Sequence, residues 1–162
     1  MALYAVSNQN AGSPQNLTSS YQSILGVVAL TGATTLRRGW VYEFEVGADN
    51  VPNANDCPIS WDISVQTAAG TGTSLTPNPI DVGGADAAAL LTYTANYTIS
   101  PTVTAASSLF YMGLNQRASQ RVIFRDEKSS LIVPAVNNKG LAFRAKSLNY
   151  ASTVGWQFYI AE

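Results

Sequence analysis

Apolar and polar side chains alternate strictly in short windows along this chain, and this alternation constrains its fold more than any other feature. The window 40–46 reads Trp-Val-Tyr-Glu-Phe-Glu-Val, with an aromatic or aliphatic side chain at every second position from Trp40. The same period recurs in windows 61–66, 122–126, 141–146 and 154–160. Successive side chains of a strand point to opposite faces of a sheet, so this period is typical of half-buried antiparallel strands.

The apolar positions of these windows define the predicted core. Because one face of each strand is rich in aromatic side chains, we expect these faces to meet inside one sandwich. The predicted core comprises Trp40, Tyr42, Phe44, Trp61, Ile63, Val65, Val122, Phe124, Leu141, Phe143, Trp156 and Phe158.

The spacing of strands and turns predicts the fold class. Further strands are expected at 2–7, 21–30, 109–115 and 131–133, and turn-forming sequences such as Asn-Asn-Lys-Gly at 137–140 separate them. A helical turn capped by Asp86 is one possibility over 86–91, but it runs into Thr-Tyr-Thr-Ala-Asn-Tyr-Thr at 92–98, which prefers extended backbone. We predict an all-β chain: residues 21–162 form a single antiparallel β-sandwich, jelly-roll-like, with an extended N-terminal arm at 1–20.

The predicted arm supplies the first group of candidate partner-binding residues. Residues 8–20 are polar and carry no charge, so the arm gains little by folding back on its own domain. Its amides and hydroxyls would hydrogen-bond along the strand edge of a neighbour and become ordered on contact. The candidates in the arm are Tyr4, Asn8, Asn10 and Asn16.

The basic residues supply the second group. The chain has 9 basic and 10 acidic residues, and this net charge of −1 gives no global attraction to nucleic acid or anionic lipid. Most of the basic residues nevertheless fall between positions 117 and 146. If neighbouring strands carry them, Arg121, Arg125, Arg144 and Lys146 form one basic patch. This patch is either a solvated surface or a protein-binding patch that faces acidic loops; nucleic acid is disfavoured because no aromatic platform interleaves the bases.

No set of residues in the sequence indicates catalysis, a metal or a cofactor. Histidine is absent, and the single Cys57 cannot form an intrachain disulfide. The oxygen-rich loop 49–56 lacks the spaced acidic ligands of a calcium loop. Glu43 and Glu45 imitate the spacing of a glycosidase pair but are typical of a surface strand. With seven residues in its longest apolar run and no visible signal peptide, the chain is expected to be made in a cytoplasm and not to enter a membrane.

Three stretches of the chain, 75–80, 114–124 and 133–143, resemble small virion proteins of tailed double-stranded-DNA bacteriophages. The sequence pattern of short strands rich in Ala, Ser, Thr and Asn most resembles that of head decoration (cement) proteins. The resemblance implies a homotrimer that binds the major capsid protein on the capsid exterior, without direct contact to nucleic acid or membrane. It carries over no contact residue, because these proteins share no fixed contact motif.

Three other functions stay open at this stage. A tail, neck or fibre component of a phage would have the same fold and a similar composition and strand pattern. A carbohydrate-binding sandwich would use Trp40, Trp61 or Trp156 as an exposed platform, although the alternation predicts that all three are buried. A glycosidase would require Glu43 and Glu45 to line a cleft.

Overall fold

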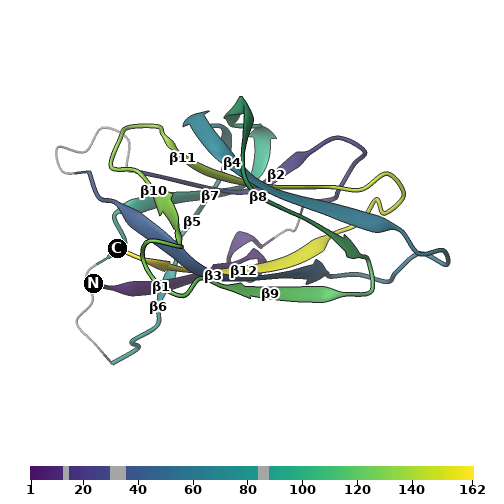
Figure 1. The fold of residues 1–162 in the computed structure, drawn as a ribbon, viewed down its shortest axis with the longest axis horizontal. Helices are drawn as coiled ribbons and strands as arrows, with labels where there is room; N and C mark the ends of the chain where they lie inside the picture. Colours follow the sequence, from purple (N-terminus) through teal and green to yellow (C-terminus); the bar gives the residue numbers. More distant parts are fainter. Residues whose placement is uncertain (13–14, 30–35, 84–87) are drawn as a thin grey trace.

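Two antiparallel β-sheets packed face to face form the computed structural model, which describes residues 1–12, 15–29, 36–83 and 88–162. Figure 1 views the two layers from one open side of the sandwich. The alternating windows of the sequence become strands in both sheets. The predicted all-β antiparallel sandwich is therefore confirmed.

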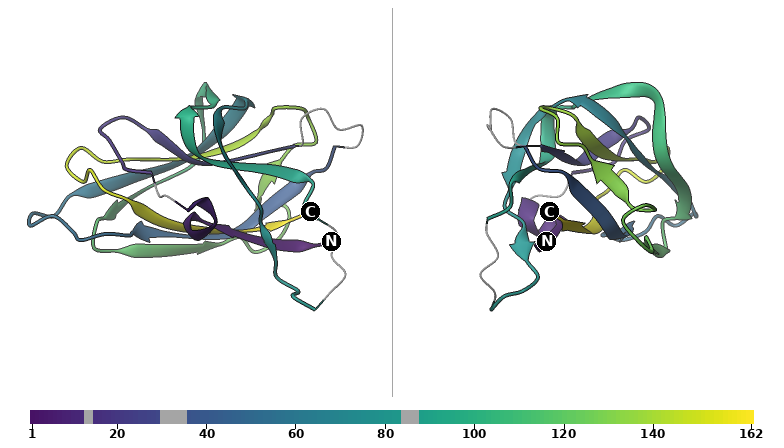
Figure 2. Two further views of the ribbon diagram at one scale, coloured as in Figure 1. Left: turned by 180° about the vertical axis from the view of Figure 1, so that it is seen from behind. Right: turned by 60° about the vertical axis from the view of Figure 1, so that its left-hand side comes forward.

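The first sheet brings the two ends of the chain together. Its central strand β12 (Val154–Ala161) lies between β1 (Leu3–Ser7) and β3 (Gly39–Ala48). Figure 2 shows the two termini side by side, as the pairing of β1 with β12 requires. The remaining strands are β6 (Asn78–Pro79), which pairs with β1, and β9 (Ser119–Ile123) and β10 (Leu131–Val133), which both pair with β3.

The second sheet has six strands in the order β5-β7-β2-β11-β4-β8. Their bounds are β5 (Thr71–Leu75), β7 (Leu91–Ile99), β2 (Gln22–Ala29), β11 (Gly140–Lys146), β4 (Pro58–Ala68) and β8 (Thr102–Asn115). A short 3₁₀ helix, η1 (Asn8–Ala11), follows β1. No helix in the described part of the chain is long and apolar enough to cross a membrane.

The pairing of strands follows a nested order. Strand β1 pairs with β12, β2 with β11, β3 with β9, and β4 with β8. The early strands thus meet the late strands in reverse sequence order. The chain also passes from one sheet to the other in the connections β1–β2, β3–β4, β8–β9 and β11–β12. The segment between β4 and β8 adds β5 and β7 to one sheet and β6 to the other.

Most of the predicted core is confirmed. Apolar and aromatic side chains from both sheets are buried together, and the rings of Phe143 and Phe158 meet across the interface with centroids 4.1 Å apart. Val65, Val122 and Phe124 are only half-buried. The predicted residues that are buried are Phe44, Trp61, Ile63, Leu141, Phe143, Trp156 and Phe158.

Trp40 and Tyr42 were predicted in the core, and this prediction is wrong because β3 contains a bulge. Tyr159 pairs with Glu43, but the next residue, Ile160, pairs with Val41. Tyr42 is therefore the extra residue of the bulge, which shifts the alternation by one position. Val41 is buried in place of Trp40 and Tyr42, which are only half-buried.

The prediction of a free N-terminal arm at 1–20 is also wrong. Strand β1 lies inside the first sheet, between β12 and β6, and Tyr4 and Val6 are 3% and 1% exposed. Leu17 is buried as well, and its backbone N–H donates to the carbonyl of Ser152. The apolar side chains at 4, 6 and 17 anchor the segment, because their burial outweighs the entropy lost on ordering a short strand. The predicted cap Asp86 lies outside the described residues, and β7 begins at Leu91.

Candidate binding surfaces

The structure makes the candidate residues of the N-terminal segment part of the fold. Tyr4 is in the core, and the buried Asn8 donates from Nδ2 to Asp49 Oδ2 (2.9 Å). Asn10 Oδ1 accepts a hydrogen bond from the Ser7 backbone N–H (2.9 Å), which closes the turn into η1. Asn16 is exposed but forms an isolated bridge with Thr153. The Tyr4 and Asn8 side chains and the backbone at Asn16 therefore fasten the segment to the sandwich.

The predicted basic patch does not exist as one surface. Strand β9 pairs with β3 in the first sheet, whereas β11 lies between β2 and β4 in the second. Arg121 thus projects from the outer face of one sheet and Arg144 from the outer face of the other. Arg121 Nε donates to Glu43 Oε1 (2.6 Å), and this hydrogen bond raises the pKa of Arg121. Arg125 is exposed.

On the second sheet, Arg144 is held by a buried carboxylate. Its Nε and Nη2 both donate to Asp62 Oδ2, at 2.8 and 2.6 Å, and Nη2 also donates to Ser64 Oγ (2.9 Å). Burial of Asp62 acts to raise its pKa, but interactions with Ser108, Ser64 and Arg144 outweigh burial, and the net pKa is lowered. Asp62 is therefore ionised at neutral pH and fixes the direction of the guanidinium group.

Tyrosines surround this ion pair. The Tyr21 ring lies 4.7 Å from Arg144 Cζ and 4.5 Å from Lys146 Nζ, measured to the ring centroid. Tyr111 is 61% exposed and pairs in register with Asp62, which itself pairs with Arg144. We call Tyr21, Tyr111, Arg144 and Lys146 the tyrosine–cation cluster; it joins the two predicted cations of β11 to two tyrosines that the sequence analysis missed.

This cluster has the chemistry of a protein-binding site. Tyrosine and arginine are the side chains that most often dominate binding energy at protein interfaces, because they offer large, rigid contact areas with polar ends. Two cations on one ring form cation–π contacts that preorganise the cluster. The only local signal in the sequence is Asp62, an acid within an otherwise uncharged strand. The tyrosines could not be assigned without knowing which strands are neighbours.

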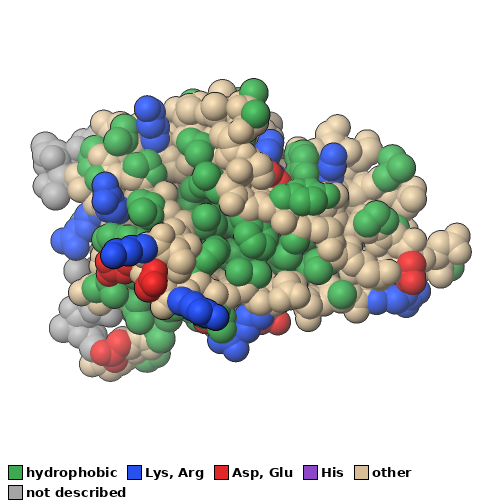
Figure 3. Space-filling view, viewed as in Figure 1, with side chains coloured by type: hydrophobic (Ala, Val, Ile, Leu, Met, Phe, Trp, Pro, Cys, Tyr) green, Lys and Arg blue, Asp and Glu red, His purple; other side chains and the backbone are tan. Residues whose placement is uncertain are grey.

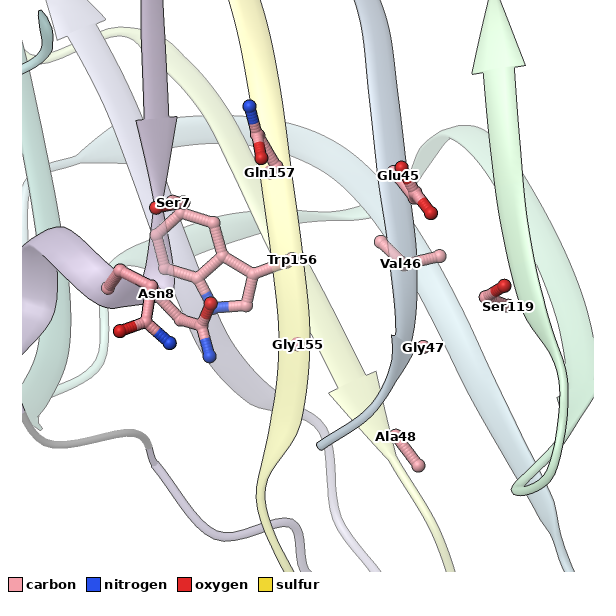
Figure 4. A pocket seen from close by; sticks show the side chains of 11 residues that line it. Ser7, Asn8, Glu45, Val46, Gly47, Ala48, Ser119, Gly155, Trp156 and Gln157 are labelled. Carbon is pink, nitrogen blue, oxygen red and sulfur yellow. The ribbon is translucent and has the colours of Figure 1, made fainter. Parts of the chain in front are cut away.

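A polar hollow of about 350 Å³ opens on the first sheet, where strands β1, β12, β3 and β9 lie side by side. Gly47 and Gly155 pair directly across β3 and β12, so this part of the hollow carries no side chain. Figure 4 shows Glu45 and Gln157 on one side of this glycine pair and Ser119 on β9. The hollow can accept a polar group of a partner close to the backbone.

A second, mainly apolar hollow of about 260 Å³ lies toward the other end of the same sheet. The bulge in β3 turns Trp40 and Tyr42 toward it, and Phe124 adds a third aromatic ring. Arg125 and Glu127 also line it. We call this cavity the aromatic hollow.

Comparisons with known proteins add no relative: no protein-family model, no curated protein and no solved structure matches this chain.

Proposed function

We propose that this chain is a virion structural protein that decorates the outside of an assembled phage head and has no enzymatic role. The sequence resemblance to cement proteins motivates the proposal. The nested strand order supports it, because first-with-last pairing across two sheets is what a jelly roll produces, and we infer a jelly roll here. The protein would be made in the host cytoplasm and bind the major capsid protein on the capsid exterior.

The tyrosine–cation cluster is the proposed contact with the shell, and it is the observation that carries the proposal. Asp62 fixes Arg144, Arg144 packs on Tyr21, and Lys146 covers the same ring. Such a preorganised group loses little side-chain entropy on binding. The cationic groups complement an acidic shell surface, which steers the encounter more than it deepens affinity. Because the chain has no histidine, few groups near this contact change charge between pH 5 and 8.

Electron micrographs of labelled particles test the location. We expect gold-labelled protein, added to particles that lack it, to spread over the head surface. Label confined to the tail, neck or fibres would contradict decoration of the head and would support the alternative of a tail component. Particles that already carry the protein serve as the control, since their occupied sites should exclude the label.

Carbohydrate binding is the second candidate, and the aromatic hollow favours it. The alternation predicted that Trp40 is buried, but the bulge turns it to the surface beside Tyr42 and Phe124. Aromatic rings bind the apolar faces of sugars, and the Glu127 carboxylate at the same hollow can accept hydrogen bonds from sugar hydroxyl groups. Titration with maltotriose, cellotriose and mannotriose should then change the tryptophan fluorescence of the native chain but not of Trp40→Phe. Unchanged fluorescence in the native chain would dismiss this candidate.

A further inference from the structure

Strand β8 is a long strand at the edge of the second sheet. It runs for 14 residues and pairs with β4 on one side; among the described residues, no strand pairs with its other side. Residues 110–115 pair with 58–63 in unbroken register, so this part of β8 is regular. The backbone N–H and C=O groups that point away from β4 in this region are available to another strand.

Other edges of the two sheets carry features that discourage pairing, whereas the irregularities of β8, which are its register shifts against β4 and the positive φ of Ala106, lie before residue 110. Strand β6 has two residues and ends at Pro79, β10 has three residues and is followed by Pro134, and β9 carries Arg121. Strand β5 has five residues and exposes no large apolar side chain. In contrast, β8 contains no charged residue and no proline, and it exposes Leu109 (50%) and Tyr111 (61%). An edge of this length and composition is a site for strand addition.

The open side of the sandwich next to β8 is also apolar. Figure 3 shows hydrophobic side chains gathered across the middle of this side, between the positions of β8 and β9 in Figure 1. These side chains pack on the core but stay partly exposed, so covering them would remove more apolar surface from water. Partly buried hydrophobic residues that pack on the core come from β8 (Phe110, Met112 and Leu114), β9 (Val122), the residue after β9 (Phe124) and β10 (Leu131).

We propose that β8 pairs antiparallel with β8 of a second copy of this chain, about a two-fold axis. A strand without charge suits its own copy, because a two-fold pairing places identical residues near one another and any charge would repel its counterpart. With the axis near Met112, residues 110–114 of the two copies pair within the regular part of β8, and Phe110 of each copy lies beside Leu114 of the other, an aromatic–aliphatic cross-strand pair formed twice. The two apolar sides then approach each other along the shared edge. This assembly does not rest on the proposed function, although Tyr111 belongs to both β8 and the tyrosine–cation cluster, and it replaces the three-fold assembly that the resemblance implies.

Light scattering and analytical ultracentrifugation of the full chain over a concentration series test the proposal. We expect a mass approaching twice the 17.2 kDa of one chain as concentration rises. The Leu109→Lys variant should raise the dimer dissociation constant at least about tenfold, because the charge enters the interface twice. The matched control is Ile99→Lys at the end of β7, where the native side chain is 65% exposed but precedes β8 and lies outside the segment 110–115 proposed to pair. This control should dimerise like the native chain.

Hydrogen exchange identifies the edge itself. Backbone amides within 110–115 that face away from β4 should exchange more slowly at high than at low protein concentration. A monomer at all concentrations would overturn the proposal, and a mass of three chains would support the three-fold assembly in its place. Equal weakening by Leu109→Lys and Ile99→Lys, or amide exchange in 110–115 that is independent of concentration, would also overturn it.

Discussion

At the scale of single residues, the aromatic side chains between the two sheets differ in how completely they are buried. Phe143 is buried against Phe158, whereas Phe124 is half-buried at the open side of the sandwich. We predict that Phe143→Ala lowers the free energy of unfolding by roughly 3–5 kcal/mol, as a fully buried aromatic residue does. Phe124→Ala should cost less than about 2 kcal/mol, since less of its surface leaves water on folding. Urea denaturation of both variants measures the difference, and equal losses would contradict this packing.

The Asp62–Arg144 pair predicts how stability depends on pH. Because the pKa of Asp62 is lowered in the folded state, the carboxylate stabilises the fold above its ordinary range near pH 4, and this contribution disappears as pH falls through the lowered pKa. The native chain should therefore exceed Asp62→Asn in free energy of unfolding by roughly 1–3 kcal/mol at pH 7, as expected for hydrogen bonds to a charged group. Urea denaturation at a series of pH values from about 7 to about 3 checks this prediction. A difference that does not shrink with falling pH would show that the charge of Asp62 is not involved.

At the scale of elements, β1 is required for the first sheet. It supplies Tyr4 and Val6 to the core and pairs with five residues of β12. Deletion of residues 1–7 should therefore abolish the cooperative thermal transition, or lower its midpoint strongly, because β12 loses its neighbour and the core is exposed. Circular dichroism during heating measures this effect. Asn16→Ala, at an exposed position in the same segment, is the control and should change stability by no more than about 0.5 kcal/mol. An unchanged transition after the deletion would restore the idea of a free arm.

The sequence predicted the strands with apolar alternation and missed those without it. The windows in β3, β4, β11 and β12 are correct, because one face of each strand meets the core. Strand β5 and the first half of β8 are rich in Thr, Ser and Gly, so no apolar period reveals them. Strand β7 does alternate, with Leu91, Tyr93 and Ala95 buried, but it was not among the windows from which the core was predicted. The bulge at Tyr42 is not visible either, since it arises from the register between β3 and β12. Periodicity within a window reports the local face of a strand and not its partner.

The candidate site was predictable only in part for the same reason. Arg144 and Lys146 were identified from their shared strand face, but Tyr21, Asp62 and Tyr111 come from three other segments of the chain. Arg121 was grouped with Arg144 although their strands belong to different sheets. Which strands become neighbours depends on long-range pairing, and a single sequence does not specify that pairing through local patterns.

At the scale of the whole molecule, the two outer faces of the sandwich have different roles in this account. The second sheet carries the tyrosine–cation cluster proposed to bind the shell, and the first sheet carries the polar and aromatic hollows. The β8 edge proposed for self-pairing borders the cluster, because Tyr111 belongs to both. Self-association and shell binding can therefore be separated through Tyr21 and Lys146, which lie on the cluster but not on β8.

Sedimentation with empty phage capsids that lack this protein tests the central claim most directly. The native chain should co-sediment with assembled capsids, and the double variant Tyr21→Ala/Lys146→Gln should bind at least about tenfold more weakly, as expected for the loss of an interface hot spot. The matched variant Tyr159→Ala/Arg125→Gln removes a tyrosine from β12 and a cation from the bend after β9, and it should bind like the native chain. A native chain that stays in the supernatant would contradict the proposed function, and equal weakening by both double variants would contradict the tyrosine–cation cluster as the contact.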